Sequence, residues 1–160
     1  MRKIHLVHII MSALLMAGCS NVSAMQQKGY EDKEFLTSDS CSYTYQSKVG
    51  NVDSESAELE FKGFSGNDYL WYVDASEDTQ VECTGSINVN KGDFKIIAVS
   101  EDKELTTVWE NIESDNNENN IIIDVPEGRN VIKIVGRKSS GDINLRIVSG
   151  DSYTVLVPRV

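Results

Sequence analysis

The sequence predicts an all-β domain, an antiparallel two-sheet β-sandwich of jelly-roll-like form, that follows an export signal and a tether. From residue 41 onward, short segments of alternating apolar and polar residues recur about every 8–12 residues, separated by turn residues. None of these segments shows the 3.6-residue period of an amphipathic helix. Connections this short favour antiparallel pairing, and the alternation gives each strand one wet face, as in a sandwich.

Residues 1–18 have the layout of an export signal. Met1-Arg2-Lys3 is a basic start, and an apolar run over residues 4–15 follows it. This run is interrupted by two histidines and a serine, and it is shorter than the roughly 20 apolar residues that a membrane-spanning helix needs. The chain is therefore expected to be exported and cut.

The residues around the cut, Met16-Ala17-Gly18-Cys19, resemble the lipobox of bacterial lipoproteins. The resemblance implies that Cys19 receives a diacylglyceryl group, becomes the new N-terminus and carries the acyl chains, such as palmitate, that anchor the protein. The protein would then sit on the cell membrane or outer membrane, facing the periplasm or the exterior. The alternative is a plain secretory signal that is cut after Ala24.

The rest of the chain divides into a tether and a domain. Residues 19–40 are rich in Gln, Ser, Lys and Glu and show no hydrophobic period, which predicts a lipid-anchored flexible tether. A short helix over residues 30–36 is the alternative for part of this segment. Residues 41–160 form the predicted β-sandwich domain. Its first strand is expected at residues 42–45.

The strands that follow are each marked by composition or alternation. Leu59 and Phe61 alternate with charged residues and are expected to face inward, and the run 69–73 is aromatic and β-branched. Gly85 indicates a bulge or bend. Turns are expected at residues 63–67, 90–93 and 139–141. The expected strands are 57–62, 69–73, 79–89, 94–98, 105–112, 121–125, 130–137, 142–149 and 153–157.

Two units of this domain are similar to β-sandwich modules found in bacterial surface and secreted proteins. One is the strand, Lys-Gly-Asp turn and strand over residues 87–96, and the other is the Val-Pro-Glu-Gly unit and following strand over residues 123–134. The resemblance implies a fold and supplies no catalytic residue, because such modules serve many functions.

Removal of residues 1–18 takes away both histidines, His5 and His8, and two of the 15 basic residues. The mature chain then has 13 basic side chains against 25 acidic ones, a net charge of −12. Without histidine, neither a Ser-His-Asp nor a Cys-His catalytic arrangement can form. The sequence also has no phosphate-binding glycine loop, and its acidity argues against nucleic acid. The prediction is a protein that is not an enzyme and uses no cofactor or metal.

Cys41 and Cys83 are the two cysteines left beside Cys19. In an oxidising, exported setting two thiols are expected to form a disulfide, here one that links neighbouring strands or facing sheets. The alternative is a pair of unbonded thiols that pack as small apolar groups.

The candidate ligand-binding residues are aromatic: Tyr69, Trp71 and Trp109, with Tyr72 nearby. Rings of this kind stack on sugars when they are exposed. On a regular strand Tyr69 and Trp71 share one face and Tyr72 lies on the other, so part of the group must be core. Outward-facing Tyr69 and Trp71 would favour glycan or protein binding, and inward-facing rings would be packing residues.

Two further candidates have simpler explanations. The loop with Asp115, Asn117, Glu118 and Asn119 lacks the glycine and terminal glutamate of a calcium loop and is read as a solvated loop. Paired acids such as Glu58 and Glu60 are expected on the wet face of their strand, where they maintain solubility.

The functional prediction is therefore a membrane-anchored extracytoplasmic lipoprotein that acts as a non-catalytic binding module at the cell envelope. Its partner would be a glycan or an envelope protein, and the N-terminal lipid would hold the protein on the membrane. The alternatives are a small carboxylate-dependent hydrolase of envelope glycans and a structural accessory subunit of an envelope complex.

Overall fold

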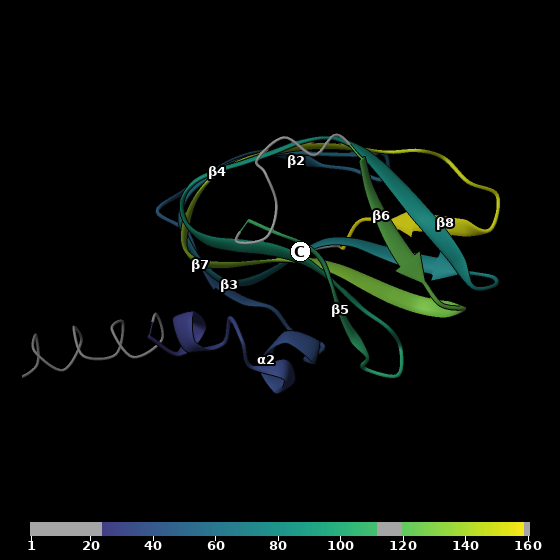
Figure 1. Cartoon of the computed structure of the whole chain (residues 1–160), viewed down its shortest axis with the longest axis horizontal. Coiled ribbons are helices and arrows are strands. Elements are labelled where there is room, and N and C mark those ends of the chain that lie inside the picture. Colours follow the sequence, from purple (N-terminus) through teal and green to yellow (C-terminus); the bar gives the residue numbers. More distant parts are fainter. Residues whose placement is uncertain (1–23, 112–119, 159–160) are drawn as a thin grey trace, which may run out of the picture.

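The structure is a computed structural model, and it describes residues 24–111 and 120–158. It confirms the prediction of an all-β, antiparallel domain (Figure 1). Two short helical segments precede the strands within the described residues, at residues 24–28 and in α2. The elements are α2 (Lys33–Thr37), β1 (Ser42–Thr44), β2 (Ser47–Val52), β3 (Ser56–Ala75), β4 (Thr79–Val99), β5 (Leu105–Glu110), β6 (Asn120–Val125), β7 (Gly128–Ile147) and β8 (Tyr153–Leu156).

Three long strands form the centre of the sheet. β7 pairs along its length with β3 on one side and with β4 on the other. The shorter strands extend the two sides: β1, β2 and β8 pair with β3, and β5 and β6 pair with β4. Every pairing is antiparallel.

Each long strand bends near its middle, so that the sheet folds over on itself into two layers (Figure 1). The sequence predicts six separate strands and three turns here, and that prediction is wrong in detail. Residues 63–67, 90–93 and 139–141 are bends inside β3, β4 and β7, and the pairing passes through them with register shifts. Gly63 and Gly92 have positive φ angles of 61° and 73°, which a glycine adopts at little cost.

Gly85 also differs from expectation, because the pairing of β4 with β7 is regular on both sides of it. Its φ is 144°, and a Cβ at this position would lie 1.9 Å from the carbonyl oxygen of Asn144. Gly85 therefore allows a close backbone approach and is not a bulge.

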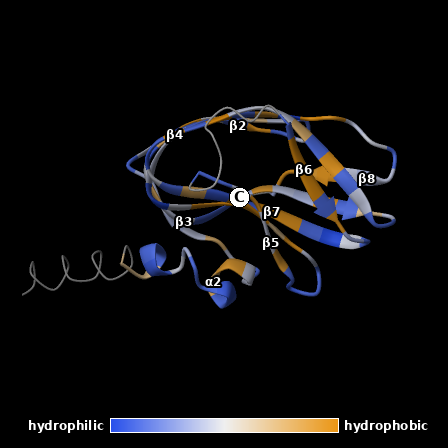
Figure 2. Cartoon of the chain, in the orientation of Figure 1, coloured by the Kyte–Doolittle hydropathy of each residue, from blue (hydrophilic) through white to orange (hydrophobic). Residues whose placement is uncertain are grey.

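The main core lies between the two layers. Phe61 in the first half of β3 stacks on Phe94 in the second half of β4, with ring centroids 4.9 Å apart. Leu59 and Phe61 point inward as the alternation predicts, whereas Glu58 and Glu60 are exposed. The hydropathy colouring shows apolar and polar residues alternating along the strands (Figure 2).

A second, smaller core lies on the outer face of the layer formed by the second half of β4 and the first half of β7. Ile97, Val99 and Val135 form its floor, and Tyr30 and Leu36, both fully buried, cover it. The covering residues belong to the segment 24–40, here named the N-terminal strap. Burial of two large apolar side chains stabilises its docking by about 1.5–3 kcal/mol each.

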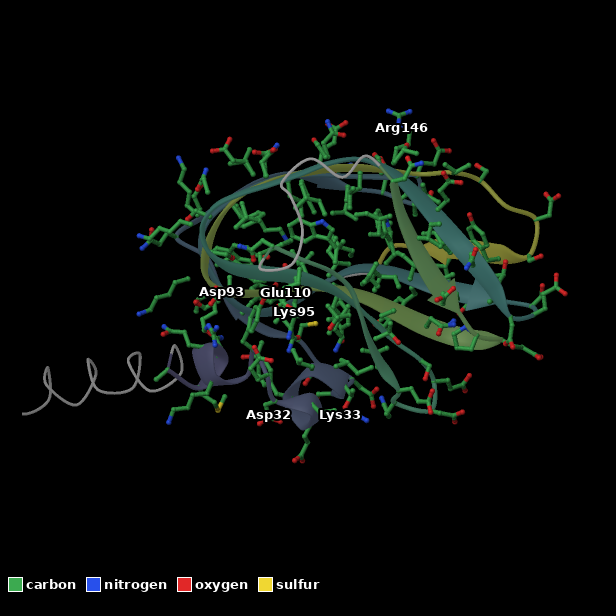
Figure 3. All side chains as sticks on the ribbon, viewed as in Figure 1. Asp32, Lys33, Asp93, Lys95, Glu110 and Arg146 are labelled. Atoms are coloured by element: carbon green, nitrogen blue, oxygen red, sulfur yellow. The ribbon has the colours of Figure 1, made fainter. Side chains whose placement is uncertain are left out.

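Polar contacts hold the strap in place as well. The Tyr30 hydroxyl donates to Glu110 at 2.8 Å, and the ammonium of Lys95 lies 4.2 Å from the centre of the Tyr30 ring. Figure 3 shows Lys95 and Glu110 pointing from the sheet toward the strap. Helix α2 begins after Asp32, whose carboxylate accepts hydrogen bonds from the backbone N–H groups of Glu34 and Phe35.

The predicted tether therefore needs correction over residues 24–40, because this part of the chain is packed on the domain. Tyr30, Phe35 and Leu36 gave no periodic signal in the sequence. Their apolar contacts are supplied by strands that lie about 60 to 105 residues further along the chain. Residues 1–23, with the lipobox and Cys19, lie outside the described residues, as does the loop 115–119.

Candidate binding cleft

A cleft of about 260 Å³ lies beside the strap, on the outer face of the layer formed by the second half of β4 and the first half of β7. Four segments line it. They are the end of the strap (Thr37, Ser38, Asp39), the second half of β3 (Tyr69, Tyr72), the end of β4 with the following loop (Val99, Ser100, Glu101, Lys103) and the start of β7 (Arg129, Val131, Lys133).

Two tyrosines of β3 share this cleft because of a bulge. Tyr69 pairs with Lys133 of β7, but the next pair is Trp71 with Ile132, so that Leu70 is an extra residue in β3. The bulge reverses the alternation, and Tyr69 and Tyr72 come to lie on the same outer face. Their ring centroids are 5.6 Å apart, and the ring planes are tilted by 46°.

Ion pairs surround the tyrosines. The Arg129 guanidinium binds both oxygens of Asp74, at 2.7 and 2.8 Å, and lies 5.7 Å from the centre of the Tyr72 ring. On the strap side, Lys103 pairs with Asp39. Hydrogen bonds from Arg129 and Lys103 lower the pKa values of Asp74 and Asp39, respectively, below that of an ordinary aspartate.

Lys133 joins the floor of the cleft to the strap. Its side chain is buried, and its ammonium donates to the carbonyl oxygens of Leu36 at 3.0 Å and Ser38 at 2.7 Å. The same ammonium lies 5.4 Å from the centre of the Tyr69 ring, and the Tyr69 hydroxyl donates to the carbonyl oxygen of Asp39. Burial lowers the pKa of Lys133 and raises that of Tyr69.

This arrangement suits binding better than acid–base chemistry. A general acid that works near neutral pH needs a raised carboxyl pKa, and the pKa values of Asp39 and Asp74 are lowered. Within residues 24–111 and 120–158, no group of three His, Cys, Asp or Glu side chains is placed to hold a metal ion. The cleft offers two tyrosine rings, paired charges and backbone carbonyls.

The predicted site residues divide between cleft and core. Tyr69 lines the cleft, but Trp71 and Trp109 are 1% and 3% exposed and belong to the main core, so they cannot form the ligand platform. The Trp71 indole N–H donates to the carbonyl oxygen of Asp53 at 2.7 Å. Tyr72, which regular alternation assigns to the face opposite Tyr69, belongs to the cleft.

The predicted disulfide is absent, because Cys41 and Cys83 are both free thiols. Cys83 points into the main core between the two layers. Cys41 lies just before β1, and its thiol is close enough to Lys133 and Tyr69 on the outer face for both to affect its pKa. The two thiols thus belong to different layers: Cys83 faces the main core from the first half of β4, and Cys41 lies near the outer face of the layer that carries Lys133 and Tyr69. Burial raises the pKa of Cys41 to about 11 and that of Cys83 to about 12.

Sequence reasoning missed Arg129, Lys133 and the strap residues of the cleft. One signal was present: Lys133 is a single charged residue within the apolar run Val131 to Val135. A lysine at such a position either faces solvent or is buried with hydrogen-bond acceptors, and here carbonyl groups of the strap accept from it. The strap contacts themselves leave no local signature.

Fold and cleft together define a β-sandwich domain with a tyrosine-lined cleft on one outer face. No protein-family profile matches the chain, and no curated protein matches it in sequence. In the part that the structure describes, no helix is long and apolar enough to cross a membrane.

Two solved structures resemble it at low identity. A family 35 carbohydrate-binding module from an environmental isolate has 15% sequence identity and a TM-score of 0.37, and the match covers 73% of this chain and 82% of that chain. The CBM35 from Cellvibrio japonicus Abf62 has 12% identity and a TM-score of 0.34, covering 68% of this chain and 78% of that chain. At these scores the likeness gives no evidence about function.

Proposed function

We propose that this protein is a non-catalytic module that binds a glycan in the Tyr69–Tyr72 cleft, and that it is exported and held on the membrane by a lipid on Cys19. The observation that carries the glycan proposal is the tyrosine pair. A bulge brings both rings to one open face, where they flank a cavity edged with polar groups.

The rings and their surroundings match the chemistry of a sugar. A pyranose ring has C–H groups that pack on an aromatic face and hydroxyls around its edge that need hydrogen-bond partners. The ring faces of Tyr69 and Tyr72 supply the first, and the Ser38, Ser100 and Glu101 side chains at the cleft edge supply the second. A cavity of about 260 Å³ is at the small end for ligand sites and suits a short glycan segment.

The charges in the cleft favour a neutral glycan. Arg129 and Lys103 are already paired with Asp74 and Asp39, and Lys133 is bonded to two carbonyls. A charged ligand would have to compete with these partners, whereas hydroxyl groups donate to carboxylates and accept from the cations while the pairs stay intact.

A glycan array with residues 20–160, which include every described element, tests this proposal. We expect binding to a neutral glycan and at least a tenfold loss of affinity in Tyr72→Ala, because a central aromatic anchor contributes about 1.4 kcal/mol or more. Tyr43→Ala is the matched control, since Tyr43 is an exposed tyrosine outside the cleft.

Two outcomes would overturn the glycan proposal. One is that no glycan on the array binds the wild-type domain. The other is that Tyr72→Ala binds as tightly as the Tyr43→Ala control while both retain the wild-type melting temperature.

The lipid anchor has a separate test. Mass spectrometry of the cell-derived N-terminus should find a diacylglyceryl group on Cys19 and no residues before it, in a protein that fractionates with the cell membrane or outer membrane. An unmodified N-terminus at Met25 would refute the anchor and favour the plain secretory signal.

A further inference from the structure

The strap enters the fold at the end of the sandwich where the three long strands bend (Figure 1). The side chain of Gln26 donates to the Ser42 hydroxyl and accepts from the Thr44 hydroxyl, both at 3.1 Å, which fixes the first turn of the strap beside β1. The next residue, Gln27, lines a hollow with Lys91 and Lys138 at the bend. The chain between Cys19 and the described fold therefore reaches the domain at its bend.

Exposed lysines gather at this end although the protein as a whole is acidic. Lys62, Lys91 and Lys138 stand at the bends of β3, β4 and β7, and all three are exposed. Two carboxylates in this region already have cationic partners: Asp93 binds Arg137 at 2.6 Å, and Glu60 makes a 3.6 Å contact with Lys62, a weak pair at this exposure.

Two exposed residues with large apolar surfaces come from the segments that meet this end, the first turn of the strap and β1. Met25, in the first turn of the strap, is 56% exposed, and Tyr43 of β1 is 39% exposed. Apolar and tyrosine side chains next to lysines are typical of surfaces that rest on a lipid headgroup layer.

The opposite end of the sandwich is acidic. Hydrogen bonds tie its loops together, among them the Glu127 N–H to Asp78 and the Ser152 hydroxyl to Glu77. The cations there, Arg129 and Lys103, are paired within the cleft. Exposed carboxylates at this end include Glu77, Asp78, Glu101, Asp102, Asp124 and Glu127.

We propose that the lysine-rich bend rests on the anionic lipid surface of the membrane and that the cleft and the acidic loops face away from it. The proposal depends on the Cys19 anchor proposed above. Cys19 and residue 24 are five residues apart, so the linker reaches at most about 18 Å even when fully extended. The bend is thus the part of the domain that the anchor holds nearest to the bilayer.

The net charge of −12 does not oppose this orientation, because salt screens the distant charges. About ten residues of strand separate the bend from the acidic loops, which is about 33 Å. At physiological ionic strength, salt screens charge interactions beyond about 8 Å, so the anionic membrane surface interacts electrostatically with the near end of the domain only. The same field would repel the acidic end if the domain turned that end toward the membrane.

Lysine footprinting on vesicles tests the orientation. Residues 20–160 carry a histidine tag in place of residues 1–19 and are bound to nickel-chelating lipid in vesicles of phosphatidylcholine, with or without 30% phosphatidylglycerol. An amine-reactive reagent labels the exposed lysines, and mass spectrometry reads the rate at each site. We expect Lys62, Lys91 and Lys138 to react at least threefold more slowly on the anionic vesicles, and Lys33 of α2 to react equally on both.

A charge swap supplies the matched comparison. In Lys91→Glu/Lys138→Glu the protection of Lys62 should disappear. In Lys33→Glu/Arg146→Glu, which changes the net charge equally, it should persist, because these two residues lie on α2 and on the layer away from the strap (Figure 3). An unchanged melting temperature shows that each variant folds.

Equal labelling of Lys62 on both kinds of vesicle would overturn the proposal, as would loss of its protection in both swapped variants. The nickel lipid replaces the natural anchor, so such a failure concerns the orientation alone. The glycan array and the N-terminal mass spectrum decide the proposed function separately.

Discussion

Replacement of Lys133 by methionine is expected to release the N-terminal strap from the sheet while the sandwich stays folded. Methionine keeps the length and apolar stem of the lysine but removes its ammonium. The carbonyl groups of Leu36 and Ser38, which now accept hydrogen bonds at 3.0 and 2.7 Å, would then lose that donor.

The size of the effect follows from these two contacts. A buried carbonyl without a donor costs about 1–3 kcal/mol, and relief from burying the ammonium of Lys133 offsets part of the sum. We expect the free energy of strap docking to fall by about 2 kcal/mol, which corresponds to roughly 30-fold more frequent opening. The main core contains no strap residue, so global stability should change far less.

Hydrogen-exchange mass spectrometry measures this directly. Amides of residues 29–38 should exchange roughly 30-fold faster in Lys133→Met. Exchange should not change in the first half of β3 and the second half of β7, which pair with each other. Lys91→Met, which removes an exposed lysine, is the control and should leave the strap protected. Unchanged exchange over residues 29–38 in Lys133→Met would refute the role assigned to the ammonium.

Three other outcomes are expected. Trp71→Phe should destabilise the domain more than Trp109→Phe in urea denaturation. The Trp71 indole donates a hydrogen bond to a carbonyl oxygen at 2.7 Å, whereas no acceptor for the Trp109 indole lies among residues 24–111 and 120–158. Equal losses of stability in the two variants would contradict this. Cys41 and Cys83 should both alkylate slowly at pH 7.5 in the native protein, because burial raises their pKa values to about 11 and 12. In guanidinium both should alkylate rapidly without reductant, because they are free thiols. A requirement for reductant would show that they form a disulfide. Because the pKa of Asp74 is lowered, its ion pair contributes stability that is present above the usual aspartate pKa and is lost as the pH falls through the lowered value. Urea denaturation should therefore show that the wild type loses more stability than Asp74→Asn between pH 5 and pH 2.5. Identical losses would argue against the ion pair.

Much of the fold could be predicted from local pattern. Leu59 and Phe61 alternate with glutamates, and such alternation identifies both the strand and its buried face. The glycines near residues 63 and 92 correctly marked where the chain changes direction. They did not reveal that strand pairing continues through the bend, because that depends on a partner strand far away in the sequence.

The candidate site was less predictable, and one residue shows why. Tyr72 reaches the face of Tyr69 only because Leu70 is inserted opposite β7. A bulge is a mismatch between two strands, so the sequence of one strand does not contain it. Regular alternation therefore placed Trp71 beside Tyr69, whereas the structure buries Trp71.

The sequence by itself determined the strand-rich composition, the buried positions of the regular strands, the absence of histidine after residue 18 and the cysteine count, since each of these is a property of residue type or short-range spacing. Tertiary structure alone decided that the thiols lie apart, that Tyr69 and Tyr72 share a cleft and that the strap packs on the sheet. The physical reason is that burial and pairing energies arise between segments tens of residues apart, and Tyr30 has no apolar surroundings until the strands that carry Ile97 and Val135 are folded beneath it.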